Sequence, residues 1–217
     1  MDIQPLIEGQ CFHIYNRGVN GGNIFIEKKN YYFFLDRYKY YCSDALETLA
    51  YCLLKNHFHF LVFVKENIEV PRKDGKEGMF RINASKQLGH LFNSYAQAIN
   101  KAYDRTGPLF ESPFERKLVT DEKYITTLIR YCHRNPVHHR FVGDLKDWEF
   151  SSYHSILNND NSIVNTEKAI IRFGSISGFE EAHNTPNISI VEEDAQEYII
   201  ERSAATQTGS LTPVRVN

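Results

Sequence analysis

The stretch KNHFHFLVFV (residues 55–64) alternates histidine with phenylalanine before it becomes wholly apolar. Side chains on a β-strand point to opposite faces in turn, so His57 and His59 share one face and Phe58 lies on the other. The apolar run after His59 favours a central strand that is covered on both faces. Two imidazoles on one face can bind one metal ion, but two half-buried histidines bonded to their neighbours are the commoner outcome of this spacing alone.

The segments around this strand predict an α+β domain. A charged stretch with Pro71 and two glycines (65–80) indicates a loop, Thr120 is the expected N-cap of the third helix, and Pro136 marks the expected end of that helix. The chain order resembles a ferredoxin-like antiparallel sheet with segregated helices. The expected strands are 11–18, 46–54, 57–64 and 114–120, and the expected helices are 30–46, 83–103 and 121–136.

Composition is that of a soluble globular protein, with 42% hydrophobic and 24% charged residues in 217 positions. We expect one domain over 1–158, a short helical C-terminal extension over 159–203, and a disordered tail over 204–217. The four cysteines show no CxxC spacing, which favours reduced thiols and a cytoplasmic protein. The chain shows no signal-peptide pattern, and no run approaches the roughly 20 apolar residues of a membrane span, so no membrane partner is expected.

The net charge of −2 is unevenly distributed. Residues 55–140 carry 15 Lys and Arg against 9 Asp and Glu, a net charge of +6, whereas residues 141–217 carry 5 against 12, a net charge of −7. A basic middle segment is typical of a protein with a polyanionic partner. A solvated charged surface explains the same counts, so charge alone leaves both interpretations open.

A second group of polar residues lies in the expected helix that holds YITTLIRYCHRNP (124–136). Tyr131 and Asn135 are four positions apart and therefore lie on one stripe of that helix, one turn from each other. Considered alone, Tyr131 is most simply interpreted as an aromatic residue of the core, and Asn135 as a turn residue before proline.

The HFH strand followed by YCHRNP resembles the single-tyrosine HUH transposases, and within them the REP-associated tyrosine transposases. Further segments resemble landmarks of that family in the same order, and the resemblance spans about residues 8 to 157. The chain departs from the pattern after the NP, where the family usually has a glycine and this chain has His139 and Arg140. The matching segments are FHIYNRG (12–18), RTGPLFES (105–112), YCHRNPV (131–137) and DWEFSSYHSI (147–156).

The resemblance implies an HUH endonuclease fold and a reaction on single-stranded DNA that carries a hairpin. Tyr131 would attack a phosphodiester, leaving a 5′-phosphotyrosine and a free 3′-OH. A divalent ion, Mg²⁺ or Mn²⁺, would be held by His57, His59 and Asn135. Two imidazoles and an amide by themselves suit Zn, Fe or Ni better than Mg. The family pattern allows Tyr131 to serve its own histidine pair or that of a second subunit in a homodimer.

Basic residues beside these motifs are candidates for phosphate contacts, which strengthen binding without reading sequence. Three rival functions stay open: an HUH relaxase or replication-initiator nickase, a catalytically silent single-stranded nucleic-acid-binding module, and a metallohydrolase that uses a metal-bound water and does not need Tyr131. The candidate DNA contacts are Arg17, Arg72, Lys73, Lys76, Arg116, Lys117, Arg130 and Arg134.

Overall fold

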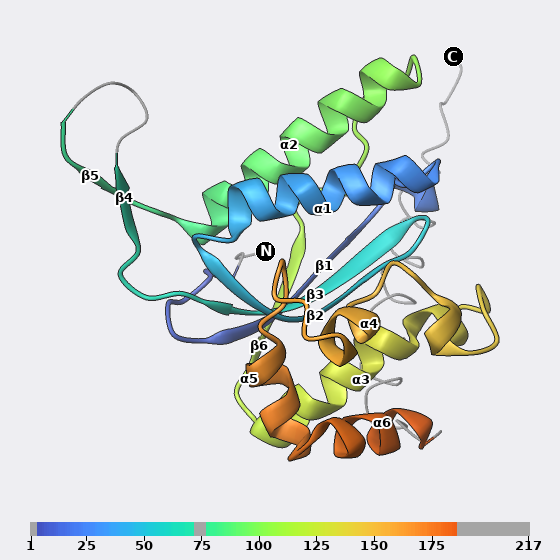
Figure 1. The fold of residues 1–217 in the computed structure, drawn as a ribbon. Helices are drawn as coiled ribbons and strands as arrows, with labels where there is room; N and C mark the ends of the chain where they lie inside the picture. Colours follow the sequence, from blue (N-terminus) through green and yellow to red (C-terminus); the bar gives the residue numbers. More distant parts are fainter. Residues whose placement is uncertain (1–3, 72–76, 186–217) are drawn as a thin grey trace, which may run out of the picture. The chain divides into compact units, whose positions relative to one another are not determined.

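A four-stranded antiparallel sheet lies at the centre of the fold (Figure 1). The computed structural model describes residues 4–71 and 77–185. The strands have the order β2–β3–β1–β6, and α1 (Lys28–Cys42) and α2 (Ala84–Ala102) make the two connections that leave the sheet and return. This is the ferredoxin-like arrangement, so the expected fold class is confirmed. The strands are β1 (Cys11–Arg17), β2 (Leu46–Leu53), β3 (His57–Val64) and β6 (Glu115–Val119).

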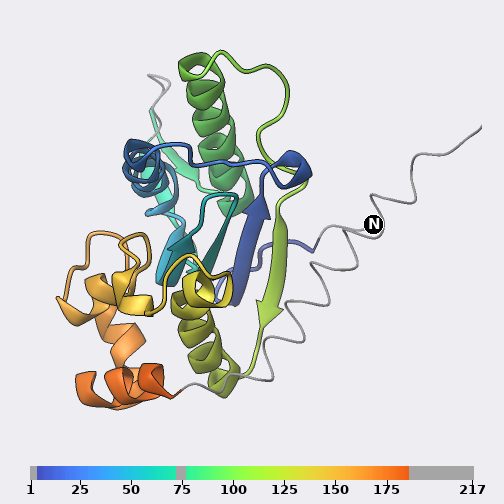
Figure 2. The ribbon, with the colours of Figure 1, turned by 90° about the vertical axis from the view of Figure 1, so that its right-hand side faces the viewer.

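The two faces of the sheet carry different helices. Helices α1 and α2 cover one face and α3 (Glu122–His138) covers the other, as the two ribbon views show (Figures 1 and 2). Phe58 packs against Phe34 of α1 with ring centroids 5.3 Å apart, and Phe60 packs against Tyr38 at 4.3 Å. The alternation of β3 therefore turns the phenylalanines toward α1 and leaves the histidines on the face of α3.

The stretch predicted as a loop over 65–80 contains a short hairpin instead. Strands β4 (Glu69–Pro71) and β5 (Met79–Arg81) pair antiparallel, with Val70 opposite Phe80. Charges and prolines normally argue against a strand, but Pro71 lies at the end of β4 in a two-stranded ribbon, where a missing N–H is tolerated.

Helix α3 differs from the prediction at both ends. Asp121, not Thr120, is the N-cap, since its carboxylate accepts the backbone N–H of Tyr124 at 2.8 Å. The helix also continues through Pro136 to His138, because the N–H groups of His139 and Phe141 close the last turn on the carbonyls of Asn135 and Pro136. Helix α1 ends earlier than predicted, at Cys42, since Leu46 already belongs to the buried strand β2.

Short helices follow the sheet. Helix α5 contacts β2 and α6 contacts α3, so the described residues up to Asn184 form one unit with the sheet. The division of the chain at 158 stays a prediction, and the tail predicted over 204–217 lies outside the described residues. The later elements are α4 (Tyr153–Leu157), α5 (Thr166–Ile170) and α6 (Ile176–Asn184), with 3-10 turns at Val19–Gly21, Leu145–Asp147 and Ile171–Phe173.

The state of the cysteines agrees with the expectation from their spacing. All four cysteines are free and buried, as expected for thiols without CxxC spacing. No helix in the described part of the chain is long and apolar enough to cross a membrane.

Candidate active site

The two histidines of β3 lie beside two residues of β1 on the face that α3 covers. In the antiparallel register Tyr15 is opposite His59 and Arg17 is opposite His57. His59 is only 4% exposed, and its Nδ1 lies 3.0 Å from Nε2 of His13, another buried β1 residue on the same face. A buried contact thus occupies one nitrogen of His59 and leaves Nε2 as its only free nitrogen.

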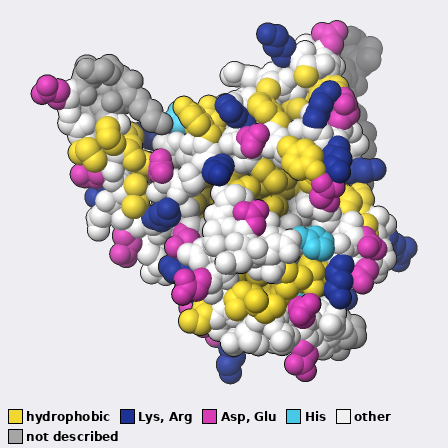
Figure 3. All heavy atoms as spheres, in the orientation of Figure 1, with side chains coloured by type: hydrophobic (Ala, Val, Ile, Leu, Met, Phe, Trp, Pro, Cys, Tyr) yellow, Lys and Arg dark blue, Asp and Glu magenta, His cyan; other side chains and the backbone are white. Residues whose placement is uncertain are grey.

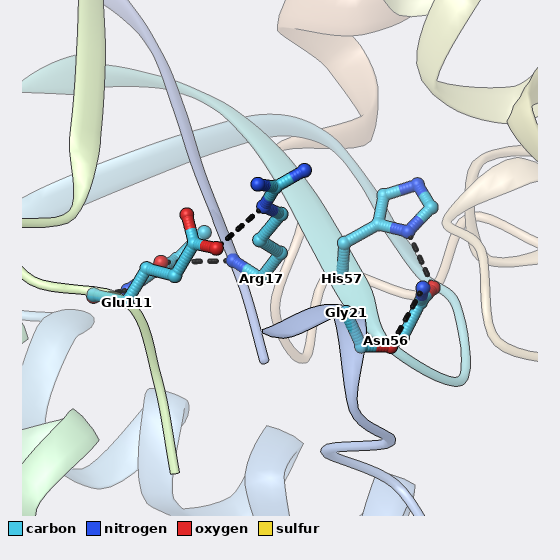
Figure 4. A network of polar contacts seen from close by, with 6 residues as sticks. Arg17, Gly21, Asn56, His57 and Glu111 are labelled. Carbon is cyan, nitrogen blue, oxygen red and sulfur yellow. Dashed lines mark hydrogen bonds and ion pairs between the residues drawn. The ribbon is translucent and has the colours of Figure 1, made fainter. Parts of the chain in front are cut away.

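A short hydrogen-bond chain orients His57 (Figure 4). Nδ1 of His57 is 2.8 Å from Oδ1 of Asn56, and Nδ2 of Asn56 donates to the carbonyl of Gly21 at 3.3 Å. An amide oxygen only accepts, so Nδ1 of His57 carries the proton and its Nε2 carries the lone pair. Such an outer partner fixes the tautomer that a metal-binding histidine needs.

Helix α3 places Tyr131 and Asn135 next to the histidines of the same chain. The Tyr131 ring meets the His59 ring edge-on, with centroids 5.6 Å apart, and Tyr131 is 5% exposed. Asn135 is fully buried, and its Nδ2 donates to the Tyr131 carbonyl at 3.1 Å, so its Oδ1 points elsewhere. The structure therefore brings His57, His59, Tyr131 and Asn135 into one cluster.

The donor atoms of this cluster fit a divalent ion. Nε2 of His57, Nε2 of His59 and Oδ1 of Asn135 are buried and meet no hydrogen-bond partner among the described residues. Buried polar atoms almost always have a partner, so three unpartnered acceptors in one place need an explanation. No group of three His, Cys, Asp or Glu side chains in residues 4–71 and 77–185 is arranged to hold a metal ion, so a site here depends on the amide oxygen of Asn135.

Burial also sets the protonation states in the cluster. Desolvation, with a smaller contribution from His139, lowers the pKa of His57 to about 3, and desolvation lowers the pKa of His59 well below its usual value. Both imidazoles are therefore neutral at pH 7 and have lone pairs to offer. Desolvation raises the pKa of Tyr131, and the Asn135 amide opposes this rise. Tyr131 is thus a neutral phenol in the resting protein.

Among the candidate DNA contacts that the structure describes, Arg17 lies directly beside the histidines, opposite His57 in the sheet. Its guanidinium is 2.7 Å from the Glu111 carboxylate (Figure 4). Arg116 lies on the opposite face of the sheet, where it donates to Ser85 Oγ of α2 at 3.1 Å. Lys117 is on the same face as the histidines, opposite His13 in the sheet.

The remaining candidates lie away from the histidines or outside the described residues. Arg134 donates to the carbonyl of His183 in α6 at 3.2 Å, and Arg130 is one turn away from it on the same side of α3. Arg72, Lys73 and Lys76 lie outside the described residues. On the face shown in Figure 3, basic and acidic side chains are interspersed, without a patch of one sign. The assignment of these residues to DNA contacts stays a prediction.

Sequence reasoning missed three polar neighbours of the cluster: His13, Asn56 and His139. Alternation along β1 puts His13 on the same face as Tyr15 and Arg17. The register between β1 and β3 brings His13 to His59, and neither strand's own sequence specifies that register.

Comparisons with known proteins support the resemblance seen in the sequence. The chain is 28% identical over 125 residues to a Haemophilus influenzae protein provisionally named a REP-associated tyrosine transposase, over 56% of this chain and 67% of that protein. It is a homologue of that transposase. No family model matches the chain.

Solved structures show the same fold. A REP-associated tyrosine transposase bound to a REP hairpin superposes with a TM-score of 0.56 at 15% identity, over 73% of this chain and 85% of that one. The likeness to this transposase confirms the α+β architecture with its antiparallel sheet and packed helices. A bacterial tRNA(His) guanylyltransferase-like protein in complex with ATP reaches a TM-score of only 0.37 at 12% identity, which carries no argument.

Proposed function

We propose that the chain is a DNA strand transferase of the single-tyrosine HUH type, which cleaves and rejoins single-stranded DNA through Tyr131. The observation that carries the proposal is the Tyr131 ring packed against His59 of the same chain, one helical turn from Asn135. The homologous transposase from Haemophilus influenzae and the structural likeness to a transposase bound to a REP hairpin support the same reading, with hairpin-bearing DNA as substrate.

The chemistry would be a transesterification at phosphorus. The phenolic oxygen of Tyr131 forms a bond to phosphorus, the bond from phosphorus to the 3′-oxygen breaks, and the departing strand takes a proton to become a 3′-OH. The phosphate stays on the enzyme as a 5′-phosphotyrosine, so the bond energy is kept. A 3′-OH can then attack it and rejoin strands without ATP, whereas a nuclease would use water.

The neutral phenol of Tyr131 is a poor nucleophile, so it must lose its proton as it attacks. Asn135 is placed to help, because its amide already favours the phenolate against burial. A divalent ion held by His57, His59 and Asn135 would supply Lewis-acid charge to a phosphate oxygen. The resemblance implies Mg²⁺ or Mn²⁺, while the donor atoms suit Zn, Fe or Ni.

One chain supplies both halves of this proposed site. Tyr131 and the histidine pair meet within the same chain, so a homodimer is not needed to assemble the cluster. Whether the protein forms a homodimer is a separate matter, and the homodimer stays a prediction.

The test is the covalent adduct. The protein is incubated with end-labelled single-stranded hairpin DNA and Mg²⁺, Mn²⁺ or Co²⁺, and a denaturing gel reveals any protein–DNA adduct. Tyr131→Phe should lose the adduct, while Tyr124→Phe, two turns earlier on α3, should keep it. An adduct that survives in Tyr131→Phe would refute the assignment of the nucleophile. Hairpin binding with no adduct under any ion would favour the silent binding module.

A further inference from the structure

Arg17 places a positive charge beside the histidines of the candidate site. It is the last residue of β1 and is directly opposite His57 of β3, so the two side chains leave the same face of the sheet. Figure 4 shows the guanidinium and the His57 imidazole projecting in the same direction from neighbouring strands. The Arg17 side chain is 27% exposed, whereas Nε2 of His57 is buried. The guanidinium therefore lies at the solvent-facing rim of the cluster.

A closed set of hydrogen bonds holds Arg17 in place. Its backbone N–H donates to Oδ1 of Asn16 at 2.8 Å, and its carbonyl accepts the N–H of Glu111 at 2.9 Å. Nδ2 of Asn16 donates to the Glu111 carbonyl at 3.0 Å, and Nε of Arg17 donates to the Glu111 carboxylate at 2.7 Å. These bonds fix the backbone and the direction of the guanidinium before any substrate binds.

The ion pair of Arg17 with Glu111 is not needed to join these two segments. Backbone bonds and the bridge between Gly18 and Phe110 already connect the end of β1 to the segment before β6. The Glu111 side chain is 19% exposed, and an ion pair that solvent reaches adds little stability. The pair also uses Nε of Arg17, so the terminal nitrogens extend beyond it, away from Glu111 (Figure 4). The arrangement therefore suits a guanidinium that is aimed at a further ligand.

We propose that Arg17 binds the scissile phosphate and stabilises the negative charge on its non-bridging oxygens while Tyr131 attacks. The inference rests on the proposed function, since it concerns the same reaction. A guanidinium presents its N–H groups in a planar fork that matches two phosphate oxygens. Arg17 is thus a catalytic residue, and Glu111 is the positioning residue that aims the fork.

The charge has a clear use, because the other members of the cluster are neutral. Burial keeps Tyr131 a phenol and keeps His57 and His59 as uncharged imidazoles. Desolvation is the main cause of the low pKa of His57, and the charge of Arg17 adds to it, so the guanidinium lies within electrostatic reach of that ring. A fixed cation that meets the charge of a transferring phosphoryl group lowers the barrier, with or without a metal ion.

Rates of adduct formation and affinities for DNA, measured separately, test this role. Excess protein is mixed with end-labelled single-stranded hairpin DNA and Mn²⁺, and the adduct is followed on denaturing gels. The Kd is measured by filter binding without the ion. We expect Arg17→Ala to slow adduct formation at least ~100-fold at saturating protein. Its Kd should rise by about 10-fold or less, since one phosphate contact among several is lost.

Two further measurements separate the guanidinium from a simple positive charge. Free guanidinium ion, added at concentrations too low to unfold the protein, should restore part of the rate of Arg17→Ala and leave wild type unchanged. Arg17→Lys should keep the wild-type Kd and stay slow, because an ammonium group cannot form the planar fork. Glu111→Gln should slow the reaction by a smaller factor than Arg17→Ala, since the guanidinium is still present.

Arg81→Gln is the matched control. Arg81 forms an ion pair with Glu8 at the same distance of 2.7 Å, but it lies on β5 in the separate two-stranded sheet. This variant should keep the wild-type rate and Kd. Melting curves of all variants show whether each one is folded.

The outcomes separate this inference from the proposed function. If wild type and Arg17→Ala form the adduct at the same rate, the role of Arg17 is overturned and the proposed function stands. A slow Arg17→Ala that regains the wild-type rate at saturating protein would make Arg17 a binding residue and refute its catalytic role. A lower melting temperature together with a rate that guanidinium ion does not restore would show a structural role instead. If wild type forms no adduct, the proposed function fails and the role of Arg17 is refuted with it.

Discussion

A buried chain of hydrogen bonds ties the tyrosine helix to the rest of the fold, and its loss should be measurable. The Nδ1 of His183 donates to the Phe179 carbonyl at 2.7 Å, so its Nε2 accepts from Nδ1 of His133 at 2.8 Å. Nε2 of His133 must then accept from the Ser152 hydroxyl at 2.7 Å. His133 is on α3, two residues from Tyr131, so this chain connects the helix of the candidate nucleophile to α4 and α6.

Ser152→Ala breaks this chain at its Ser152 end, where the hydroxyl meets Nε2 of His133. It leaves Nε2 of His133 without a donor and the N–H of Tyr51 without the Ser152 oxygen that it now reaches at 2.9 Å. Each buried polar group left without a partner costs ~1–3 kcal/mol, so the free energy of unfolding should fall by about 2–6 kcal/mol.

Urea unfolding at pH 7.5 measures this change, with the midpoint and the slope fitted together. Ser162→Ala is the matched control, because Ser162 is exposed and its replacement should change stability by less than about 0.5 kcal/mol. A loss below about 1 kcal/mol in Ser152→Ala, with the slope unchanged, would refute the reasoning about the hydrogen-bond chain.

Three further predictions follow from the same structure. Desolvation lowers the pKa of His183 to about 4, so the stability from its neutral form is complete above the unfolded value of about 6.5 and is lost as pH falls toward 4. Between pH 7.5 and 5.5 the free energy of unfolding should therefore fall by about 1.4 kcal/mol on account of His183. His183→Gln should remove that share of the pH dependence, as measured by urea unfolding at both pH values. A pH dependence equal to that of the wild type would contradict this prediction. Arg140→Gly should raise the free energy of unfolding by about 0.5–1 kcal/mol because it relieves the left-handed residue, whereas Arg140→Ala should not; equal effects would show that the turn is unstrained. Asn56→Ala should weaken Co²⁺ binding about 10- to 100-fold in calorimetry, because His57 loses the partner that orients it, and an unchanged affinity would remove Asn56 from that role.

Local sequence patterns predicted the parts of the candidate site that lie within one element. The alternation of β3 put His57 and His59 on one face and Phe58 on the other, and the ring contacts of Phe58 with α1 confirm this separation. The four-residue spacing in α3 likewise placed Tyr131 and Asn135 on one buried stripe. Periodicity is a local property, so it can be read from the sequence directly.

Contacts between elements could not be predicted in this way. The approach of His13 to His59 depends on the register of two strands separated by α1 and β2, and the approach of His139 to His57 depends on the turn at Arg140. The end of α3 was predicted wrongly for a different reason, because a local sequence rule was applied where tertiary hydrogen bonds override it. Pro136 should stop the helix, but hydrogen bonds from the following residues carry it to His138.

Mass spectrometry of the covalent adduct tests most directly whether Tyr131 is the nucleophile. Wild-type protein is reacted with single-stranded hairpin DNA, digested with nuclease and protease, and the peptide that carries the nucleotide is sequenced. We predict a 5′-phosphonucleotide on the oxygen of Tyr131, which lies against the His59 ring. A nucleotide on another tyrosine, such as Tyr15 or Tyr124, would contradict the proposed mechanism, and so would the absence of any modified peptide under conditions in which DNA is cleaved.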